Sequence, residues 1–317
     1  ANPAATSSLT NVQGSLGPNT YYLTVTDDNN CTASDNITIT QPDVLSSSSS
    51  VTDVDCNGNS TGEIDLTVSG GTTSYSYSWV NDATPNTVIS TNEDLTGLAP
   101  GDYSCTVTDN NQCTTTESAV TVSEPANALS SSSSVTDVDC NGNSTGEIDL
   151  TVSGGTTSYS YSWVNDATPN TVISTNEDLT GLAPGDYSCT VTDNNQCTTT
   201  ESAVTVSEPA NALSSSSSVT DVDCNGNSTG EINLTVSGGT TTYSYSWVND
   251  ATPGTVISTS EDLTGLAAGD YSCTITDNNQ CTTTESAVTV GQPNAALTAT
   301  ITQTNSIDCN GDADGEL

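Results

Sequence analysis

The chain has 317 residues, of which 39 are acidic and none is Lys, Arg or His. Because no side chain can neutralise a phosphate, this composition argues against nucleic-acid binding and against attraction to anionic lipid. No apolar run approaches the roughly 20 residues that a membrane helix needs, so we expect no direct membrane insertion. Cations and neutral or basic surfaces remain as plausible partners.

An internal repeat organises the sequence. Residues 45–128 and 129–212 are identical, and 213–297 is a near copy with scattered differences. A fixed period of this length indicates a tandem array. We therefore predict five segments: the C-terminal part of a repeat at 1–44, full repeats at 45–128, 129–212 and 213–297, and the N-terminal part of a further repeat at 298–317. We expect the sequence to be a piece of a longer array, which leaves any secretion signal, anchor or tip domain outside it.

The predicted elements of the first full repeat are short. In chain order they are a polar strand or flexible junction at 46–53, a strand at 64–68, a Gly-Gly turn at 70–71, a strand at 75–79, a loop at 81–86, a short edge strand at 87–90, an approach with Leu95 and Leu98, a strand at 103–108, a turn at 109–112 and a last strand ending at Val122. Apolar and polar residues alternate along the strands, and no stretch has a helical period. The pattern predicts an all-β fold: a tandem array of Ig-like antiparallel β-sandwich repeats of about 84 residues.

One segment resembles a hallmark of immunoglobulin domains. Leu98-Ala-Pro-Gly-Asp-Tyr103-Ser-Cys105, with Trp79 upstream, is similar to a tyrosine corner with its core Trp. The likeness is incomplete, because the strand that should supply the partner cysteine carries Ile64, Leu66 and Val68. We expect a sandwich without the inter-sheet disulfide.

A more specific resemblance covers all three full repeats and both partial ones. The runs Asp-Cys-Asn-Gly, Gly-Glu-Ile-Asp-Leu-Thr-Val-Ser-Gly-Gly, Tyr-Ser-Tyr-Ser-Trp and Val-Thr-Asp-Asn-Asn-Gln-Cys, with a closing Glu-Pro, resemble the SprB-type repeat. The resemblance implies a giant filamentous adhesin of gliding Bacteroidetes, exported by the type IX secretion system and carried along the cell surface by motors. Cys105 is an extra cysteine for that pattern. Repeats of this kind also occur in surface proteins unrelated to gliding.

The 11 cysteines of this acidic chain indicate an oxidising, extracellular setting at the cell surface. Cys56 and Cys113 have counterparts in every segment that reaches them, whereas Leu23 stands at the position of Cys105. We expect disulfides Cys56–Cys113, Cys140–Cys197 and Cys224–Cys281, and buried thiols at Cys105, Cys189 and Cys273. Two alternatives stay open: pairing across a repeat boundary, Cys113 with Cys140, and a fully reduced chain.

A possible cofactor is calcium, because a turn with Asp at alternate positions, Gly and a later Glu can offer several oxygens to a hard cation. The candidate ligands are Asp53, Asp55, Asn57 and Glu63 in the first repeat, Asp137, Asp139, Asn141 and Glu147 in the second, and Asp221, Asp223, Asn225 and Glu231 in the third. The alternative is a solvated Asn-Gly turn. The stripe Tyr75, Tyr77, Trp79 could bind carbohydrate, but its period of two favours a place in the core.

Enzymatic chemistry is not expected. Without His, Lys or Arg there is no triad base, and paired carboxylates would make every repeat a glycosidase. The leading hypothesis is a structural stalk of a secreted adhesin whose repeats contact mainly their neighbours. The alternatives are multivalent polysaccharide-binding repeats and a static extender rigidified by calcium. Surface polysaccharide and the gliding or secretion machinery are further candidate partners.

Overall fold

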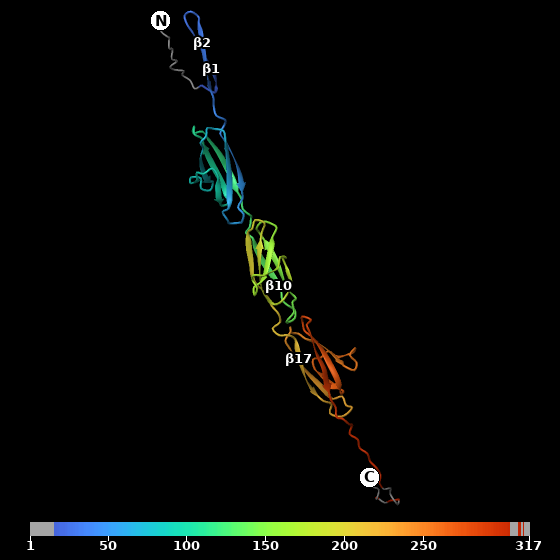
Figure 1. Cartoon of the computed structure of the whole chain (residues 1–317). Coiled ribbons are helices and arrows are strands. Elements are labelled where there is room, and N and C mark those ends of the chain that lie inside the picture. The colour runs from blue at the N-terminus through green and yellow to red at the C-terminus, as the bar shows by residue number, and fades with distance from the viewer. Residues whose placement is uncertain (1–15, 305–309, 312, 314–317) are drawn as a thin grey trace. The chain divides into compact units, whose positions relative to one another are not determined.

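The computed structural model describes residues 16–304, 310, 311 and 313 (Figure 1). The fourth start of the repeat, with Cys309, lies mostly outside the described residues. The described chain divides into two compact units. One runs to residue 129 and includes residues 154–156 and 195–197; the other holds 130–153, 157–194 and 198 onward. No helix in the described part is long and apolar enough to cross a membrane.

The first full repeat is a sandwich of seven strands in two antiparallel sheets. Its strands are β3 (Ser46–Thr52), β4 (Gly62–Ser69), β5 (Ser76–Asn81), β6 (Val88–Ser90), β7 (Leu95–Leu98), β8 (Gly101–Thr108) and β9 (Thr114–Val122). One sheet has the order β3-β4-β7 and the other β6-β5-β8-β9. The short fourth strand, β6, pairs with β5 in the larger sheet, whereas a constant-type immunoglobulin domain has its fourth strand on the other sheet.

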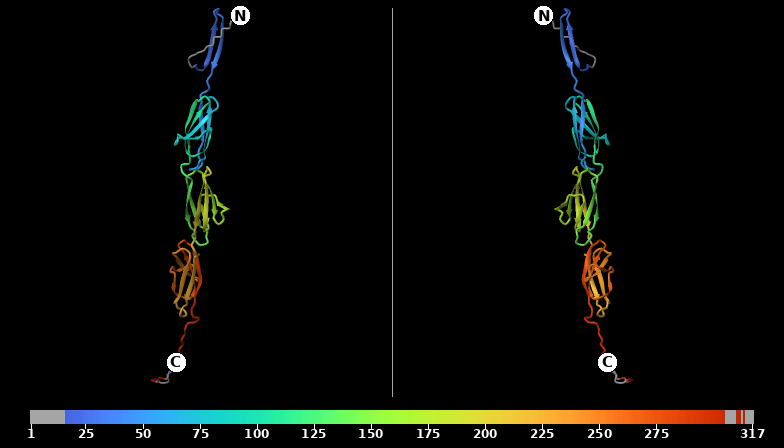
Figure 2. Two further views of the ribbon diagram at one scale, coloured as in Figure 1. Left: turned by 90° about the vertical axis from the view of Figure 1, so that its left-hand side faces the viewer. Right: turned by 90° about the vertical axis from the view of Figure 1, so that its right-hand side faces the viewer.

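The second and third repeats have the same strands in the same order. Figure 2 shows that all three repeats are built of strands. The strands are β10 (Ser130–Thr136), β11 (Gly146–Ser153), β12 (Ser160–Asn165), β13 (Val172–Ser174), β14 (Leu179–Leu182), β15 (Gly185–Thr192) and β16 (Thr198–Val206), then β17 (Ser214–Thr220), β18 (Gly230–Ser237), β19 (Ser244–Asn249), β20 (Val256–Ser258), β21 (Leu263–Leu266), β22 (Gly269–Thr276) and β23 (Thr282–Val290). The predicted fold class, a tandem array of Ig-like sandwiches, is confirmed.

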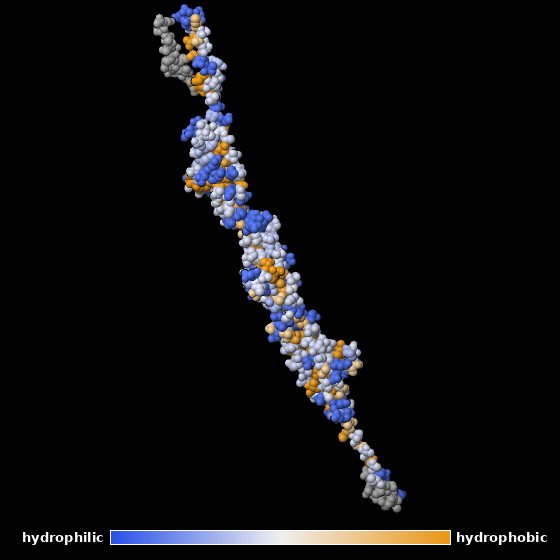
Figure 3. Space-filling view, viewed as in Figure 1, coloured by the Kyte–Doolittle hydropathy of each residue, from blue (hydrophilic) through white to orange (hydrophobic). Residues whose placement is uncertain are grey.

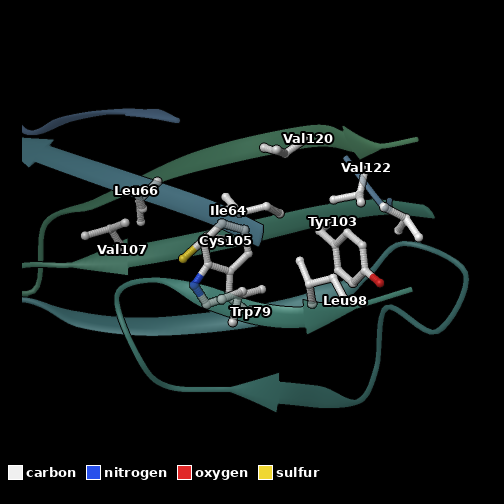
Figure 4. Close-up of a cluster of buried hydrophobic side chains, with 11 residues drawn as sticks. Ile64, Leu66, Trp79, Leu98, Tyr103, Cys105, Val107, Val120 and Val122 are labelled. Carbon is white, nitrogen blue, oxygen red and sulfur yellow. The ribbon is translucent and has the colours of Figure 1, made fainter. Parts of the chain in front are cut away.

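The core of each repeat follows from the alternation of apolar and polar residues. In β4, Ile64 and Leu66 are buried while the residues between them are exposed, because successive side chains of a strand point to opposite faces. Trp79 lies fully buried in the middle of the cluster, next to its cross-strand neighbour Cys105 (Figure 4). The indole N–H of Trp79 donates to the carbonyl oxygens of Asn92 and Glu93, both at 3.1 Å.

The tyrosine corner is present in all three repeats. The hydroxyl of Tyr103 donates to the carbonyl oxygen of Ala99 at 2.8 Å, and Tyr187 and Tyr271 make the same bond four residues back. Cys105 stands where an immunoglobulin domain has its second core cysteine, but β4 faces it with apolar side chains, so no inter-sheet disulfide forms.

The serine-rich segment forms the strand β3. The carboxylate of a glutamate on β9 binds the serine hydroxyls of this strand. Ser47 and Ser49 are half-buried, and their hydroxyls donate to the two carboxylate oxygens of Glu117 on β9, at 2.9 and 3.0 Å. Because β3 and β9 belong to different sheets, Glu117 joins the sheets along one edge of the sandwich. Glu201 and Glu285 bind the equivalent serines of the later repeats.

Within residues 16–44, the part of the N-terminal segment that the structure describes, the strands form one hairpin, β1 (Asn19–Thr26) with β2 (Thr32–Ile39). It corresponds to β8 and β9, and the Tyr21 hydroxyl donates to the carbonyl oxygen of Gly17 as in a tyrosine corner. Leu23 and Val25 are 43% and 46% exposed, whereas their counterparts in the first full repeat, Cys105 and Val107, are fully buried. Apolar side chains are therefore exposed on this hairpin (Figure 3).

Candidate functional site

In each repeat, two loops outside the core each contain one cysteine. The Cys56 loop (residues 53–61) joins β3 to β4, and the Cys113 loop (residues 109–113) joins β8 to β9. The later repeats have the same loops, named here by their cysteines: the Cys140 loop (137–145), the Cys197 loop (193–197), the Cys224 loop (221–229) and the Cys281 loop (277–281).

The carboxylate of Asp55 holds the Cys56 loop in shape. Its Oδ1 accepts hydrogen bonds from the backbone N–H of Cys56 at 2.6 Å, the hydroxyl of Thr61 at 2.7 Å and the side-chain amide of Asn59 at 3.1 Å. These donors, the Thr61 hydroxyl foremost, lower the pKa of Asp55 below its usual value, since they favour the ionised form. Gly58 lies at the turn with φ +83°, a conformation that glycine adopts readily.

A buried carboxylate shapes the Cys113 loop. Asp109 is 3% exposed; its Oδ2 accepts from the backbone N–H of Thr72, and its Oδ1 accepts from the N–H groups of Asn111 and Cys113, all at 2.8–2.9 Å. The N–H of Thr72 is the main reason that the pKa of Asp109 is lowered. These bonds attach the Cys113 loop to the turn between β4 and β5.

The two loops lie at opposite ends of the sandwich. The Cys113 loop precedes the first residue of β9, whereas the Cys56 loop binds the chain just after its last residue: Asp53 accepts from the N–H of Ser123, and Asn57 donates to the carbonyl oxygen of Pro125. A strand of nine residues spans about 27 Å at about 3.4 Å per residue. Two cysteines need Cα atoms within about 7 Å to form a disulfide.

The predicted pairing within each repeat is therefore wrong. The disulfides are Cys56–Cys197 and Cys140–Cys281, each with a Cα–Cα distance of 5.7 Å and a sequence separation of 141 residues. Each links the first cysteine of one repeat to the last cysteine of the next. The structure contains none of the predicted bonds Cys56–Cys113, Cys140–Cys197 and Cys224–Cys281, nor the alternative Cys113–Cys140. Among the described residues, Cys31, Cys113 and Cys224 are exposed and have no disulfide.

Each disulfide lies in a small polar joint. Next to Cys56–Cys197, the side-chain amide of Asn195 donates to the carbonyl oxygen of Asp55 at 3.0 Å. Next to Cys140–Cys281, Asn279 donates to the carbonyl oxygen of Asp139, also at 3.0 Å. Beside the second disulfide is a cavity of about 370 Å³, lined in part by Asn141, Leu213 and both cysteines. The joint therefore occurs twice in the chain. In each case one disulfide and one asparagine hydrogen bond connect a loop of one repeat to a loop of the next.

The remaining cysteines among the described residues belong to the core. Cys105, Cys189 and Cys273 are fully buried and form no disulfide. Burial raises the pKa of all three thiols, to about 11 for Cys273, because a thiolate is poorly solvated there. A thiol with a raised pKa is a weak nucleophile.

The candidate calcium ligands are not brought together. Among the described residues, no group of three or more His, Cys, Asp or Glu side chains is placed to hold a metal ion. Asp55, Asp139 and Asp223 instead accept hydrogen bonds from Thr and Asn within their own loops, and Asp53, Asp137 and Asp221 accept backbone N–H groups. Glu63, Glu147 and Glu231 lie exposed on strands, and Asn57, Asn141 and Asn225 donate to the prolyl carbonyls.

The aromatic stripe packs into the sandwich. Trp79 is fully buried, and Tyr75 and Tyr77 are half-buried against the core. The hydroxyl of Tyr75 donates to the carbonyl oxygen of Gly70 at 2.6 Å. Burial, with a smaller effect of Glu93, raises the pKa of Tyr77 to about 12. The stripe offers no open ring face of Trp79 to a sugar.

Sequence reasoning did not identify the asparagine of the joint. Asn195 and Asn279 stand two residues before the paired cysteines, in the run Asp-Asn-Asn-Gln-Cys. That run is typical of a turn, and nothing in it distinguishes an asparagine that binds a neighbouring repeat from one exposed to solvent. The one feature of the sequence that could have identified this asparagine is that the run recurs before Cys113, Cys197 and Cys281.

The repeat is recognised by comparison with known families. The SprB repeat matches residues 48–84, 132–168 and 216–252. The chain carries three SprB repeats. Each match runs from within the first strand of a sandwich to just beyond the third, so it includes the Cys56, Cys140 or Cys224 loop and ends before the loop that supplies the other half of the joint. A search of curated proteins found no match.

Solved structures similar to the chain include several arrays of domains. The N-terminal eight Ig domains of Down Syndrome Cell Adhesion Molecule share 12% identity at a TM-score of 0.27, over 87% of this chain and 51% of that one. Drosophila OTK extracellular domains 3–5 share 13% over 74% and 92%, at a TM-score of 0.29. Domains 4–9 of the surface layer protein SbsC share 17% over 84% and 50%, at 0.24. The chain thus spans about half the length of the Down Syndrome Cell Adhesion Molecule structure. Because the TM-scores are this low, the description of the fold rests on the strand order given above.

Proposed function

We propose that the SprB repeats are structural units in the stalk of a large secreted adhesin at the cell surface. The observation that carries this proposal is the pair of disulfides Cys56–Cys197 and Cys140–Cys281, which link each repeat covalently to the next. A bond of this kind limits the extension of the chain under load, which suits a stalk and has no obvious use in an enzyme. In this proposal the structural units are 45–128, 129–212 and 213–297, with 1–44 and 298–317 as parts of further repeats.

The composition supports the same role. A chain with 39 acidic residues and no basic ones stays soluble when many copies are crowded on a surface. Disulfides persist in oxidising compartments, which supports an extracellular location. Neighbouring repeats are the partners that the two joints favour. We include a role in gliding motility in this proposal on the basis of the resemblance to the SprB-type repeat alone.

A mechanical experiment tests the load-bearing role. The shortest covalent path from Cys56 to Cys281 crosses both disulfides and has about 57 residues in place of about 225. At about 3.5 Å per extended residue, breaking both bonds adds roughly 590 Å to the fully stretched length. We expect single-molecule pulling of the whole chain to show this gain after reduction. A stretched length unchanged by reductant would contradict the stalk.

A second experiment tests location and motility. Live source cells labelled with a fluorescent antibody against residues 45–128 should show signal on their surface. Signal that travels along the cell would support the gliding role. Stationary signal would be consistent with a stalk and would contradict a role in gliding motility. Failure to label intact cells, with labelling after permeabilisation, would contradict the surface location.

A further inference from the structure

Each joint contains an asparagine hydrogen bond in addition to its disulfide. The side-chain amides of Asn195 and Asn279 donate across the joint to the carbonyl oxygens of Asp55 and Asp139, both at 3.0 Å. We propose that Asn195 and Asn279 are positioning residues for disulfide formation: each amide docks two folded loops without a covalent bond, and so brings their thiols together before they are oxidised. This inference concerns how a joint forms and does not depend on the stalk role.

The loop that supplies the asparagine has the same internal bond with and without a disulfide. In the bonded Cys281 loop, Asp277 accepts a hydrogen bond from the N–H of Cys281 at 2.9 Å. In the Cys113 loop, which has no disulfide, Asp109 accepts the equivalent bond from the N–H of Cys113 at 2.8 Å. A carboxylate of the same repeat therefore folds this loop, and the fold does not require oxidation.

The opposite loop is also folded by its own repeat. In the bonded Cys140 loop, Asp139 accepts a hydrogen bond from the hydroxyl of Thr145 at 2.6 Å. In the Cys224 loop, which has no disulfide, Asp223 accepts the equivalent bond from Thr229 at 2.7 Å. Both halves of a joint can thus be folded while their cysteines are still thiols.

The asparagine amide is the part of its loop that changes partner. In the Cys113 loop, the amide of Asn111 donates to the Thr72 hydroxyl of its own repeat at 2.9 Å. In the two bonded loops, the equivalent amides of Asn195 and Asn279 donate to a carbonyl oxygen of a neighbouring repeat. The bond to the neighbour is therefore not needed for the fold of the loop, and it is available for docking.

The acceptor of this bond lies next to the cysteine that reacts. Asp55 directly precedes Cys56 in the chain. The carbonyl oxygen of Asp55 lies 3.0 Å from the side-chain nitrogen of Asn195 and 3.4 Å from the sulfur of Cys197. In the second joint the corresponding distances from the carbonyl oxygen of Asp139 are 3.0 and 3.3 Å. Because one carbonyl oxygen contacts both the amide and the sulfur, docking of the loops raises the effective concentration of one thiol at the other.

Side-chain packing does not achieve this positioning by itself. The cavity of about 370 Å³ beside Cys140–Cys281 leaves one side of the second joint open. A hydrogen bond is directional and can orient two loops across such a gap, whereas the burial of apolar surface has no preferred direction.

The covalent step needs an oxidant, for which oxidised glutathione is sufficient. The thiolate of Cys56 attacks one sulfur of glutathione disulfide, forms a mixed disulfide and releases one glutathione thiolate. The thiolate of Cys197 then attacks the Cys56 sulfur, and the second glutathione leaves as a thiolate. Two protein thiols are oxidised, and one glutathione disulfide is reduced to two thiols. The hydrogen bond of Asn195 acts in the second step, because only that step requires the two loops to meet.

A redox titration of the whole chain tests the proposal. In a background with four further cysteines replaced (Cys31→Ser, Cys113→Ser, Cys224→Ser and Cys309→Ser), the reduced chain is equilibrated with mixtures of reduced and oxidised glutathione. Mass spectrometry of the trapped peptides gives an equilibrium constant for each disulfide. We expect Asn195→Ala to lower the constant of Cys56–Cys197 about fivefold, as for one lost hydrogen bond. Cys140–Cys281 should be unchanged in the same molecules.

Two further variants separate positioning from folding. Asn279→Ala should weaken Cys140–Cys281 about fivefold and leave Cys56–Cys197 unchanged. Asn194→Ala, which removes an exposed amide beside Asn195, should change neither constant. Because the second repeat supplies one cysteine to each joint, a variant that only unfolds this repeat would weaken both disulfides together.

Three results would overturn the proposal. Unchanged constants in Asn195→Ala and Asn279→Ala would show that the amides do not position the thiols. An equal loss at both joints in Asn195→Ala would show that this residue acts through the fold of its repeat. Equal losses in Asn194→Ala and Asn195→Ala would show that the effect is not specific to the amide that crosses the joint.

Discussion

The hydroxyl of Ser47 donates to the carboxylate of Glu117 at 2.9 Å, and this bond crosses from one sheet of the sandwich to the other. Ser49 donates to the second oxygen of the same carboxylate. The five consecutive serines of β3 have no apolar side chains to bury, and the one apolar residue of the strand, Val51, is exposed. The carboxylate of Glu117 therefore supplies the attachment of this serine run to β9.

Removing that carboxylate should loosen β3. We expect Glu117→Ala to lower the free energy of unfolding of the first repeat by about 1–3 kcal/mol, the usual range for hydrogen bonds to a half-buried charged group. Urea denaturation of the whole chain measures this. The matched control is Glu63→Ala, an exposed acid on β4. Equal effects of the two variants would contradict a specific role of Glu117.

Asp109 should make the first repeat sensitive to acid. Its pKa is lowered in the folded state, chiefly by the N–H of Thr72. The stabilisation is therefore fully present above the unfolded pKa of about 3.9 and is lost as the pH falls through the folded pKa. We expect Asp109→Asn to be less stable than the parent chain at pH 7, with a difference that shrinks below about pH 4. Melting temperatures across pH 2–7 check this, and a pH-independent difference would contradict it.

The free cysteines should separate into two classes by reactivity. In the folded chain with Cys309→Ser, we expect iodoacetamide at pH 8 to modify Cys31, Cys113 and Cys224, which are exposed. Cys105, Cys189 and Cys273 should react only after denaturation, because they are fully buried and their pKa values are raised. Mass spectrometry counts the modified sites. Six rapid modifications in the folded chain would contradict the buried thiols.

Calcium should have little effect on stability. The carboxylates of Asp53 and Asp55 already accept hydrogen bonds, and they form no group with Glu63 that could hold a metal ion. We expect the melting temperature to be the same with calcium and with a chelator, at constant ionic strength. A rise with calcium that Asp55→Asn abolishes would show that the loop rearranges around the ion.

Much of each sandwich was predictable from local pattern. The alternation around Ile64 and Leu66 places side chains on alternate faces of a strand, so it determines both the strand and its buried face. Tyr103 and Trp79 identified the type of sandwich, since the corner involves residues only four apart in the chain. The identical repeats determined how often the fold recurs.

Only the tertiary structure decided which groups meet over long distances. Cys56 and Cys113 recur together in every full repeat, yet they lie at the two ends of β9, and Cys56 bonds to Cys197 of the next repeat. Likewise, nothing near Glu117 in the sequence reveals that Ser47 and Ser49 are its partners, 70 and 68 residues away. The reason is physical: an alternating pattern determines the face to which a side chain points, whereas the partner it meets depends on how the strands and their loops are arranged in space.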